Sequence, residues 1–515
     1  MIYTVDSAIR RLILIALLLT GSVINALADI NVEYGASVTA QLSSSSLAPY
    51  MLGSWNEGRY AEGSGIWQEA WAEKHLDMDR RFSWSAGIGY LAGAGSKTYY
   101  DRWDEETGTW GTSGARRNAF RITSLYGELK YRQVFLTLGI KEGISKIVDG
   151  RLSSGDLTRS NNASPIPGIA TGFLDFQDIP FTNGWVQING EIMYGRMMDS
   201  GFKKREFNQY SGIEAADLYY NYKYCYFRTN PDKDFHVTVG MQAAALFGGT
   251  TYTYRSGKLV ETTRRGFKPK DLLQAFFPME GGESYYEGSH LGSWDLKATY
   301  RFREGSKLHA YFEWPWEDGS GIGRMNGWDG LWGLQYDFAR RGAVTKAVVE
   351  YLDFTNQSGP IHFDQEDNPG NPLTGVAQGG DNYYNNDYYG AYTNYGMSIG
   401  TPFLLAPIYN RNGMLDYLHN RARGFHVAVE GNPTERLGYR VMVGYSVAGG
   451  AGRIPDFQKS HSTSGMVEAR WQPSVRMPGL ELSMKMAIDR GSLRGDNFGV
   501  QLQVGYRGDF NLKKR

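Results

Sequence analysis

Leu480-Glu481-Leu482-Ser483-Met484-Lys485-Met486-Ala487-Ile488-Asp489 alternates apolar and polar residues almost without interruption. Every even position is apolar, and four of the five odd positions are polar or charged. Successive side chains of a β-strand point to opposite faces, so this stretch predicts a strand with one apolar and one polar face. A soluble sheet over a core shows the same pattern. Because the pattern recurs along the chain behind an export signal, it favours a barrel with lipid outside and water inside.

The same alternation predicts an all-β chain of about eighteen antiparallel strands, an even number as in bacterial barrels. The predicted strands are 31–42, 66–78, 81–93, 118–131, 134–142, 184–195, 214–228, 234–247, 290–303, 307–316, 330–338, 344–356, 388–401, 422–431, 437–447, 463–472, 480–489 and 498–510. Short turns at 132–133, 304–306 and 432–434 contrast with long connections at 94–117, 248–289, 317–329 and 448–462. Outer-membrane barrels have short periplasmic turns and long external loops in this way.

The up-and-down order fails in two segments, 143–183 and 357–421. Strands 134–142 and 184–195 should both run outward, so the segment between them must cross back. Either each segment contains a further strand, or it returns through the lumen. We therefore expect a lumen that long segments occlude.

Residues 1–28 have the features of a cleaved signal peptide. Arg10 and Arg11 precede the apolar run 12–19, and Ala26-Leu27-Ala28 is a small-x-small cleavage site. This predicts export, with residues 29–515 as a single barrel domain in the outer membrane of a Gram-negative bacterium. Outer-membrane lipid and the barrel-insertion machinery are the expected partners.

Composition excludes several other classes of protein. Of 54 basic and 54 acidic residues, two and one lie in the signal peptide, which leaves a formal charge of −1. A nucleic-acid binder would carry a basic excess, so nucleic acid is not an expected partner. The mean hydropathy of −0.44 fits a barrel, because only alternate residues face lipid. Cys225, the single cysteine, excludes an intrachain disulfide.

Motifs for catalysis are missing from the sequence. It contains no HExxH, no phosphate-binding loop and no GxSxG. The eight histidines show no metal-ligand spacing, and the acidic run 365–368 reads as a solvated loop. We therefore predict no catalytic residues, no metal and no cofactor. A surface hydrolase is the disfavoured alternative.

Two runs combine aromatic rings with amides and carboxylates, at 314–330 and 380–389. Aromatic rings cover the apolar face of a sugar, while Asp and Asn bond its hydroxyls. The candidate glycan-binding residues are Trp316, Asp318, Arg324, Asn326, Trp328, Asp329, Asp381, Asn382, Tyr383 and Asn385. The alternative is structural: aromatics at strand ends form membrane-interface girdles, and Asn, Asp and Gly form turns. Asp318 and Asp329 flank a ten-residue loop that they could simply tie into the lumen.

Several short runs, in a shared order over about three hundred residues, resemble the capsule assembly protein Wzi family. They are 160–168, 290–295, 317–321 with Asn326, 329–333, Glu350-Tyr351, 357–360 and 381–386. The resemblance implies an outer-membrane barrel of about eighteen strands with a lectin-like role. Such a protein would retain or assemble capsular or other surface polysaccharide, with capsule export proteins as further partners. One departure is that strand-like sequence begins near Asn31, where enterobacterial members carry a helical segment. The alternative function is a diffusion porin, general or oligosaccharide-specific.

Overall fold

The structure is a computed structural model that describes residues 30–277, 288–317, 319–358, 380–451, 455–473 and 476–512. The predicted signal peptide, the acidic run 365–368 and the candidate residue Asp318 lie outside these ranges.

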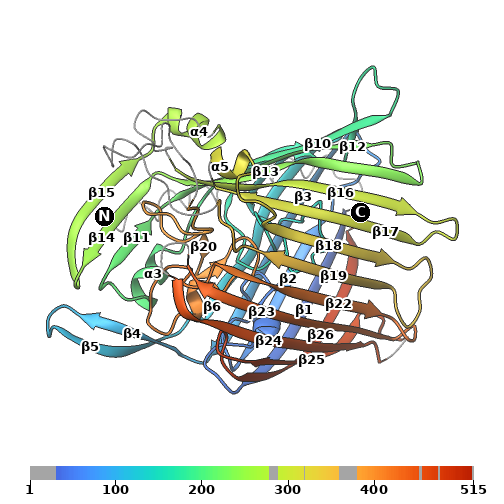
Figure 1. The fold of residues 1–515 in the computed structure, drawn as a ribbon. Helices are drawn as coiled ribbons and strands as arrows, with labels where there is room; N and C mark the ends of the chain where they lie inside the picture. Colours follow the sequence, from blue (N-terminus) through green and yellow to red (C-terminus); the bar gives the residue numbers. More distant parts are fainter. Residues whose placement is uncertain are drawn as a thin grey trace.

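Eighteen antiparallel strands form a closed wall (Figure 1), in which β8 and β9 together make one interrupted strand beside β10. The wall strands are β1 (Ile30–Ser43), β2 (Gly65–Lys74), β3 (Phe82–Gly95), β6 (Phe120–Tyr131), β7 (Val134–Ile140), β8 (Gly168–Phe173) with β9 (Gln177–Asp178), β10 (Val186–Arg196), β12 (Tyr219–Thr229), β13 (Phe235–Phe247), β16 (Ser289–Arg301), β17 (Lys307–Trp316), β18 (Gly330–Asp337), β19 (Lys346–Asp353), β22 (Ala422–Gly431), β23 (Leu437–Gly450), β24 (Pro455–Trp471), β25 (Leu480–Arg490) and β26 (Asn497–Leu512). The first and last strands pair from Ile30 with Leu512 to Ser43 with Gly499, which closes the barrel. The predicted fold class is confirmed.

The two interruptions of the up-and-down order have different causes. In 143–183 a strand was missed, because β8 is only six residues long and is separated from β9 by three residues. In 357–421 the prediction of a wall strand at 388–401 is wrong. β19 pairs directly with β22, and residues 388–401 lie inside the barrel, where β20 (Thr393–Asn394) and β21 (Met397–Ser398) form a small hairpin. Predicted strand 214–228 is also split, since its start belongs to a separate external strand.

The stretch that decided the fold shows which face of the wall is apolar. Met484, Met486 and Ile488 are 42%, 42% and 38% exposed on the outside of β25. Ala487 and Asp489, between and beyond them, are buried against the lumen contents. A soluble sheet would bury the apolar face instead. The outside of the barrel is therefore an apolar belt, as expected for a surface in contact with lipid.

Three loops fold into the lumen, and we call them the lumen plug: residues 44–64, 141–167 and 380–421. They meet inward side chains of the wall and form the largest buried apolar cluster, which includes Leu157, Tyr384 and Tyr417 of the plug and Tyr220 of β12. Helix α2 (Tyr50–Gly53) packs in the same way on β24 and β25. The main core of this barrel thus lies in its lumen, and the predicted occlusion is seen.

The remaining elements lie at the long-loop end, on the left in Figure 1, opposite the short turns. They are the hairpin of β4 (Thr98–Asp104) and β5 (Thr109–Ala115), the sheet of β11 (Gly212–Ala216), β14 (Gly249–Arg255) and β15 (Lys258–Gly266), and helices α3 (Ser200–Glu206), α4 (Pro269–Phe276) and α5 (Gly319–Ile322). The 3-10 turn Pro407–Tyr409 belongs to the lumen plug. Across the described ranges, no helix combines the length and apolar character needed to span a membrane.

Candidate functional site

Asn326 stands at the centre of the sequence-predicted site and is fully buried. Its side-chain oxygen accepts a hydrogen bond from the indole nitrogen of Trp314 at 2.6 Å. Its amide nitrogen donates to the carbonyl of Pro315 at 2.6 Å and to the hydroxyl of Tyr383 at 2.9 Å. The loop after β17 is thereby joined to the lumen plug through one side chain.

Asp329 extends this network from the other end of the same loop. Its carboxylate accepts the backbone N–H groups of Asn356 and Gln357 at 3.0 and 2.7 Å, and the Tyr383 hydroxyl at 3.0 Å. Burial raises the pKa of Asp329 to about 6, although these three donors act in the opposite direction. Asp329 therefore anchors the start of the segment after β19 and the plug at once.

The candidates in 381–385 shape the plug itself. The Asn382 side-chain oxygen accepts from Asn420 at 2.6 Å and from Asn385 at 3.1 Å. Asn385 also exchanges two hydrogen bonds with the backbone of Tyr417, at 3.0 and 2.8 Å. Asp381 is buried and accepts from the Ser358 hydroxyl at 2.5 Å. Asn385 thus satisfies backbone groups of Tyr417, and Asn382 and Asp381 pair with other polar side chains, as buried polar groups require.

Trp328 and Arg324 lie on the outside, in an aromatic cluster over β17 and β18. Trp328 is 69% exposed and stacks on Trp314 with ring centroids 6.2 Å apart, and the Arg324 guanidinium lies 3.9 Å above the Trp314 ring. Trp332 packs against Trp328 at 5.7 Å. Trp316, at the end of β17, is buried. This arrangement is typical of an interface girdle, the structural alternative for these aromatics.

Of the nine described candidates, Asn326, Asp329 and Tyr383 connect the loop after β17 to the plug. Asp381, Asn382 and Asn385 form hydrogen bonds with other residues in or beside the plug. Trp328 is the one with a largely exposed ring. Contact of this set with a glycan stays a prediction, whereas its hydrogen bonds show how the loop and plug are held.

Buried carboxylates also fix the plug to the wall at a second place. Glu350 of β19 accepts hydrogen bonds from the Ser153 hydroxyl at 2.5 Å and from the Ser154 hydroxyl and N–H at 2.6 and 2.7 Å. Asp156 of the plug accepts from Gln242 of β13 at 2.7 Å. The plug segment 153–156 thus bridges β19 and β13, which three strands of the wall separate.

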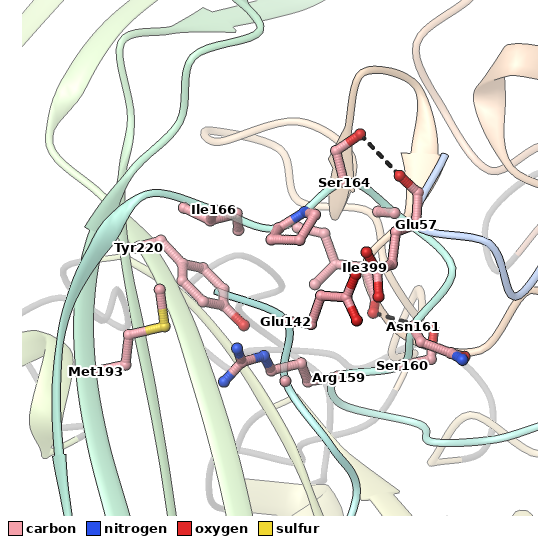
Figure 2. Close-up of a pocket in the computed structure, with 13 residues that line it drawn as sticks. Glu57, Glu142, Arg159, Ser160, Asn161, Ser164, Ile166, Met193, Tyr220 and Ile399 are labelled. Atoms are coloured by element: carbon pink, nitrogen blue, oxygen red, sulfur yellow. Dashed lines mark hydrogen bonds between the residues drawn. The ribbon is translucent and has the colours of Figure 1, made fainter. Parts of the chain in front are cut away.

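The cavities described between plug and wall are small. Figure 2 shows one, whose volume is about 30 Å³, lined by Glu142, Arg159 and Ser164 of the plug and by Met193 and Tyr220 of the wall. That volume suits a water molecule, and ligand sites usually need several hundred Å³. None of the cavities described between plug and wall would hold a ligand as large as a sugar. No group of three or more His, Cys, Asp or Glu residues within the described ranges could hold a metal ion.

A further aromatic group, which the sequence reasoning missed, stands at the long-loop end. Trp103 and Trp110 are cross-strand partners in the β4–β5 hairpin, and Tyr210 precedes β11. Their ring centroids are 5.6, 5.0 and 4.8 Å apart, and Trp110 is 50% exposed. We call these three residues the aromatic platform. The Asp104–Gly108 turn between two tryptophans was a hairpin signal within the predicted loop 94–117.

The closed 18-stranded wall, the packed lumen and the apolar outside place this protein in the class of outer-membrane β-barrels. No protein-family description matches the sequence, and neither does any curated protein.

Among solved structures, the chain is similar to Wzi of Escherichia coli, described as an outer membrane protein involved in group 1 capsule assembly and a carbohydrate-binding β-barrel. The TM-score is 0.51 at 11% identity, over 91% of this chain and 83% of that chain. Two structures from Pseudomonas aeruginosa follow. OccK5 (OpdH) has a TM-score of 0.45 at 8% identity, over 94% and 98% of the two chains, and OccK3 (OpdO) has 0.43 at 10%, over 93% and 96%. The likeness to Wzi shows a shared barrel fold.

Proposed function

We propose that this protein is a non-enzymatic outer-membrane barrel that binds surface polysaccharide and holds it at the cell surface. The observation that carries the proposal is the aromatic platform, with Trp110 exposed and Trp103 and Tyr210 half-buried, at the long-loop end of a barrel whose lumen is filled. The description of Wzi as carbohydrate-binding, and the motif resemblance to its family, support the same role.

The apolar belt and the filled lumen together favour this reading. Exposed apolar side chains on alternate residues of the wall belong in lipid, and only a closed barrel can place strands there without unpaired backbone groups. The polysaccharide would then bind at the loop end, where the platform lies.

The platform has the chemistry that a sugar ring requires. Sugars present apolar C–H faces that pack on aromatic rings, while carboxylates bond their hydroxyls. The exposed side chains of Asp101 and Glu105 lie on the same hairpin as Trp103 and Trp110. Trp328 would add a second, separate aromatic contact.

Surface-polysaccharide retention in a deletion strain tests the proposal. Complementation with the unaltered protein should restore cell-bound polysaccharide, whereas Trp103→Ala with Trp110→Ala should leave most of it in the medium. Tyr131→Ala, an exposed aromatic at the short-turn end of β6, is the matched control and should complement fully. If the deletion strain itself sheds no polysaccharide, the anchoring role is wrong.

The porin alternative has no specific observation in its favour. The cavities described between plug and wall are water-sized, so a continuous path through the described part of the lumen would require the plug to move.

A further inference from the structure

Helix α4 packs on the outside of the wall, whereas the plug packs on the inside. Tyr220 of β12 points into the lumen, where its hydroxyl lies 3.2 Å from that of Tyr392 in the plug. Successive residues of a strand face opposite sides, so Asn221 and Lys223 face outward. Helix α4 lies on that side, in contact with β12 and β13 (Figure 1), and the Lys223 ammonium lies 5.5 Å from the Phe276 ring. The helix thus lies over a polar pair on a face that elsewhere forms the apolar belt.

Side chains cap α4 at both ends. The Asp271 carboxylate accepts the backbone N–H of Lys268 at 2.7 Å, at the start of the helix. At the other end, the Lys223 Nζ donates to the carbonyl of Ala275 at 2.8 Å, one of the carbonyls that a helix leaves without a partner. Lys223 therefore serves as the cap of this helix. Paired backbone groups are what a helix needs to lie in lipid.

The middle of α4 is level with the apolar belt. The Tyr194 hydroxyl of β10 donates to the carbonyl of Leu272 at 2.8 Å. Tyr194 pairs with Ile169 of β8, which in turn pairs with Leu138 of β7. Ile169 and Leu138 are exposed apolar residues of the belt, and register partners lie side by side across a sheet. The helix is therefore continuous with the surface that faces lipid.

The two ends of α4 lie at different depths along the wall. Phe267, just before the helix, packs on Tyr219 with ring centroids 5.0 Å apart, and Tyr219 is the first residue of β12 at the loop end. Phe276 and Phe277, at the other end, line a groove on the outer face together with Cys225, six residues further along β12. The helix thus descends from the loop end toward the middle of the wall.

Charge and apolar surface are distributed along α4 in the same order. Lys268 and Lys270, at the end nearer the loops, are exposed. Leu273 and Phe277, further along, are 64% and 56% exposed. A membrane presents anionic phosphate headgroups above hydrocarbon, and interfacial helices carry lysine and large apolar side chains to match. This order identifies lipid as the partner of the exposed side of α4.

We propose that α4 is an interfacial helix in the external leaflet of the outer membrane, with Leu273 and Phe277 among the acyl chains and Lys268 and Lys270 at anionic phosphate headgroups. The inference rests on the bilayer position of the wall and is independent of polysaccharide binding. In this position the helix keeps the Lys223 ammonium out of contact with hydrocarbon, where a charge is costly.

Spin labels on single cysteines test the depth of α4. The full chain with Cys225→Ala is reconstituted in vesicles of dioleoylphosphatidylcholine and dioleoylphosphatidylglycerol. A nitroxide on Leu273→Cys should collide with oxygen more often than with a water-soluble nickel chelate, as should one on Val443→Cys in the belt of β23. Val260→Cys is the matched control, because Val260 is an exposed apolar residue of the external strand β15, and its label should collide mainly with nickel.

Two other results at Leu273 would overturn the proposal. A label that collides mainly with nickel would place α4 in water. A label that collides little with either reagent would mean that protein, from this chain or a second copy, covers this side of the helix. Nickel access at Val443 would instead refute the bilayer position of the wall, and with it the proposal.

Lys268→Gln with Lys270→Gln tests the headgroup contact. In native mass spectrometry the unaltered protein should retain dioleoylphosphatidylglycerol in preference to dioleoylphosphatidylcholine, and each lost lysine should lower this preference about fivefold. Lys97→Gln with Lys258→Gln is the matched control, since it removes two exposed lysines beside the external hairpins and should keep the preference. A preference that survives in Lys268→Gln with Lys270→Gln would overturn the headgroup contact. Polysaccharide retention should be unaffected by these variants.

Discussion

Asn326 shows how a residue chosen for sugar chemistry can serve the fold. Side-chain amides both donate and accept, which suits sugar hydroxyls and irregular backbone equally. Here Asn326 satisfies Trp314, Pro315 and Tyr383, which lie on β17 and on the plug. The residue types in a motif therefore limit which hydrogen bonds it can form. They do not decide whether a sugar or the protein itself supplies the partner.

Asp329 gives the loop attachment a pH dependence. Its pKa is about 6 in the folded protein and 3.8 in an unconstrained chain, so between these values only the folded state holds the proton. The attachment should be strongest below pH 4 and weaken as the pH rises through 6, by an amount of the order of 3 kcal/mol. Hydrogen exchange of residues 319–329, corrected for intrinsic rates, measures this change.

Two variants separate Asp329 from other titrating groups. Asp329→Asn cannot ionise, so the protection of the loop should no longer change between pH 4 and 7. Tyr383→Phe removes a donor that favours the carboxylate, so the midpoint should move to higher pH. A midpoint that stays in place in both variants would assign the pH dependence to another residue.

At the scale of elements, the plug is held by side chains from distant parts of the chain. Ser154 and Glu350 are 196 residues apart, and the plug's apolar residues join the largest buried cluster. The wall closes independently through backbone pairing of β1 with β26. Wall and plug are thus built from different interactions, and each should respond separately to mutation.

Removing a part of the plug should therefore open the barrel without unfolding it. The full chain should show no steady conductance in a planar bilayer. A variant in which a short Gly-Ser linker replaces residues 383–417 should conduct, since this segment contributes Tyr384, Tyr392 and Tyr417 to the lumen core. Deletion of the external hairpin 98–115 is the control and should stay closed. Steady conductance by the full chain that sugars block would instead favour the porin.

At the scale of the whole molecule, the wall exposes apolar side chains on its outer face, where a soluble sheet would bury them against a core. Val443, in the middle of β23, is 50% exposed, whereas its neighbour Met442 is fully buried in the lumen core. If the outside meets lipid, a charge on it should be costly in proportion to its depth.

Two arginine substitutions on one face of β23 test this arrangement. Val443→Arg, at mid-strand, should lower the free energy of unfolding in lipid vesicles by about 2–4 kcal/mol, and Leu437→Arg, at the short-turn end, by about 0–1 kcal/mol. Urea titration of the refolded protein in vesicles measures both. Equal costs at the two depths would mean that the outer belt does not cross a bilayer.

Seventeen of the eighteen predicted strands correspond to wall strands, and the exceptions have physical causes. Residues 388–401 alternate like a strand but lie in the lumen, because tyrosine and glycine suit an irregular packed segment as well as a sheet. β8 was missed because six residues with two glycines carry little periodic signal. For the site, the motif residues were found but their partners were not, since Asn382 meets Asn420 only after the plug folds.

The sequence by itself determined the wall: a period of two, repeated along the chain, encodes alternating faces through local backbone geometry alone. It also located the two segments that break the up-and-down order. Only the tertiary structure decided that both segments contribute to the lumen plug and that one of them also supplies the wall strand β8. It also decided that candidate residues such as Asn326 and Tyr383 bond one another, and that Trp103, Trp110 and Tyr210 meet at the loop end. Those outcomes depend on contacts between residues far apart in the chain, which no local pattern specifies.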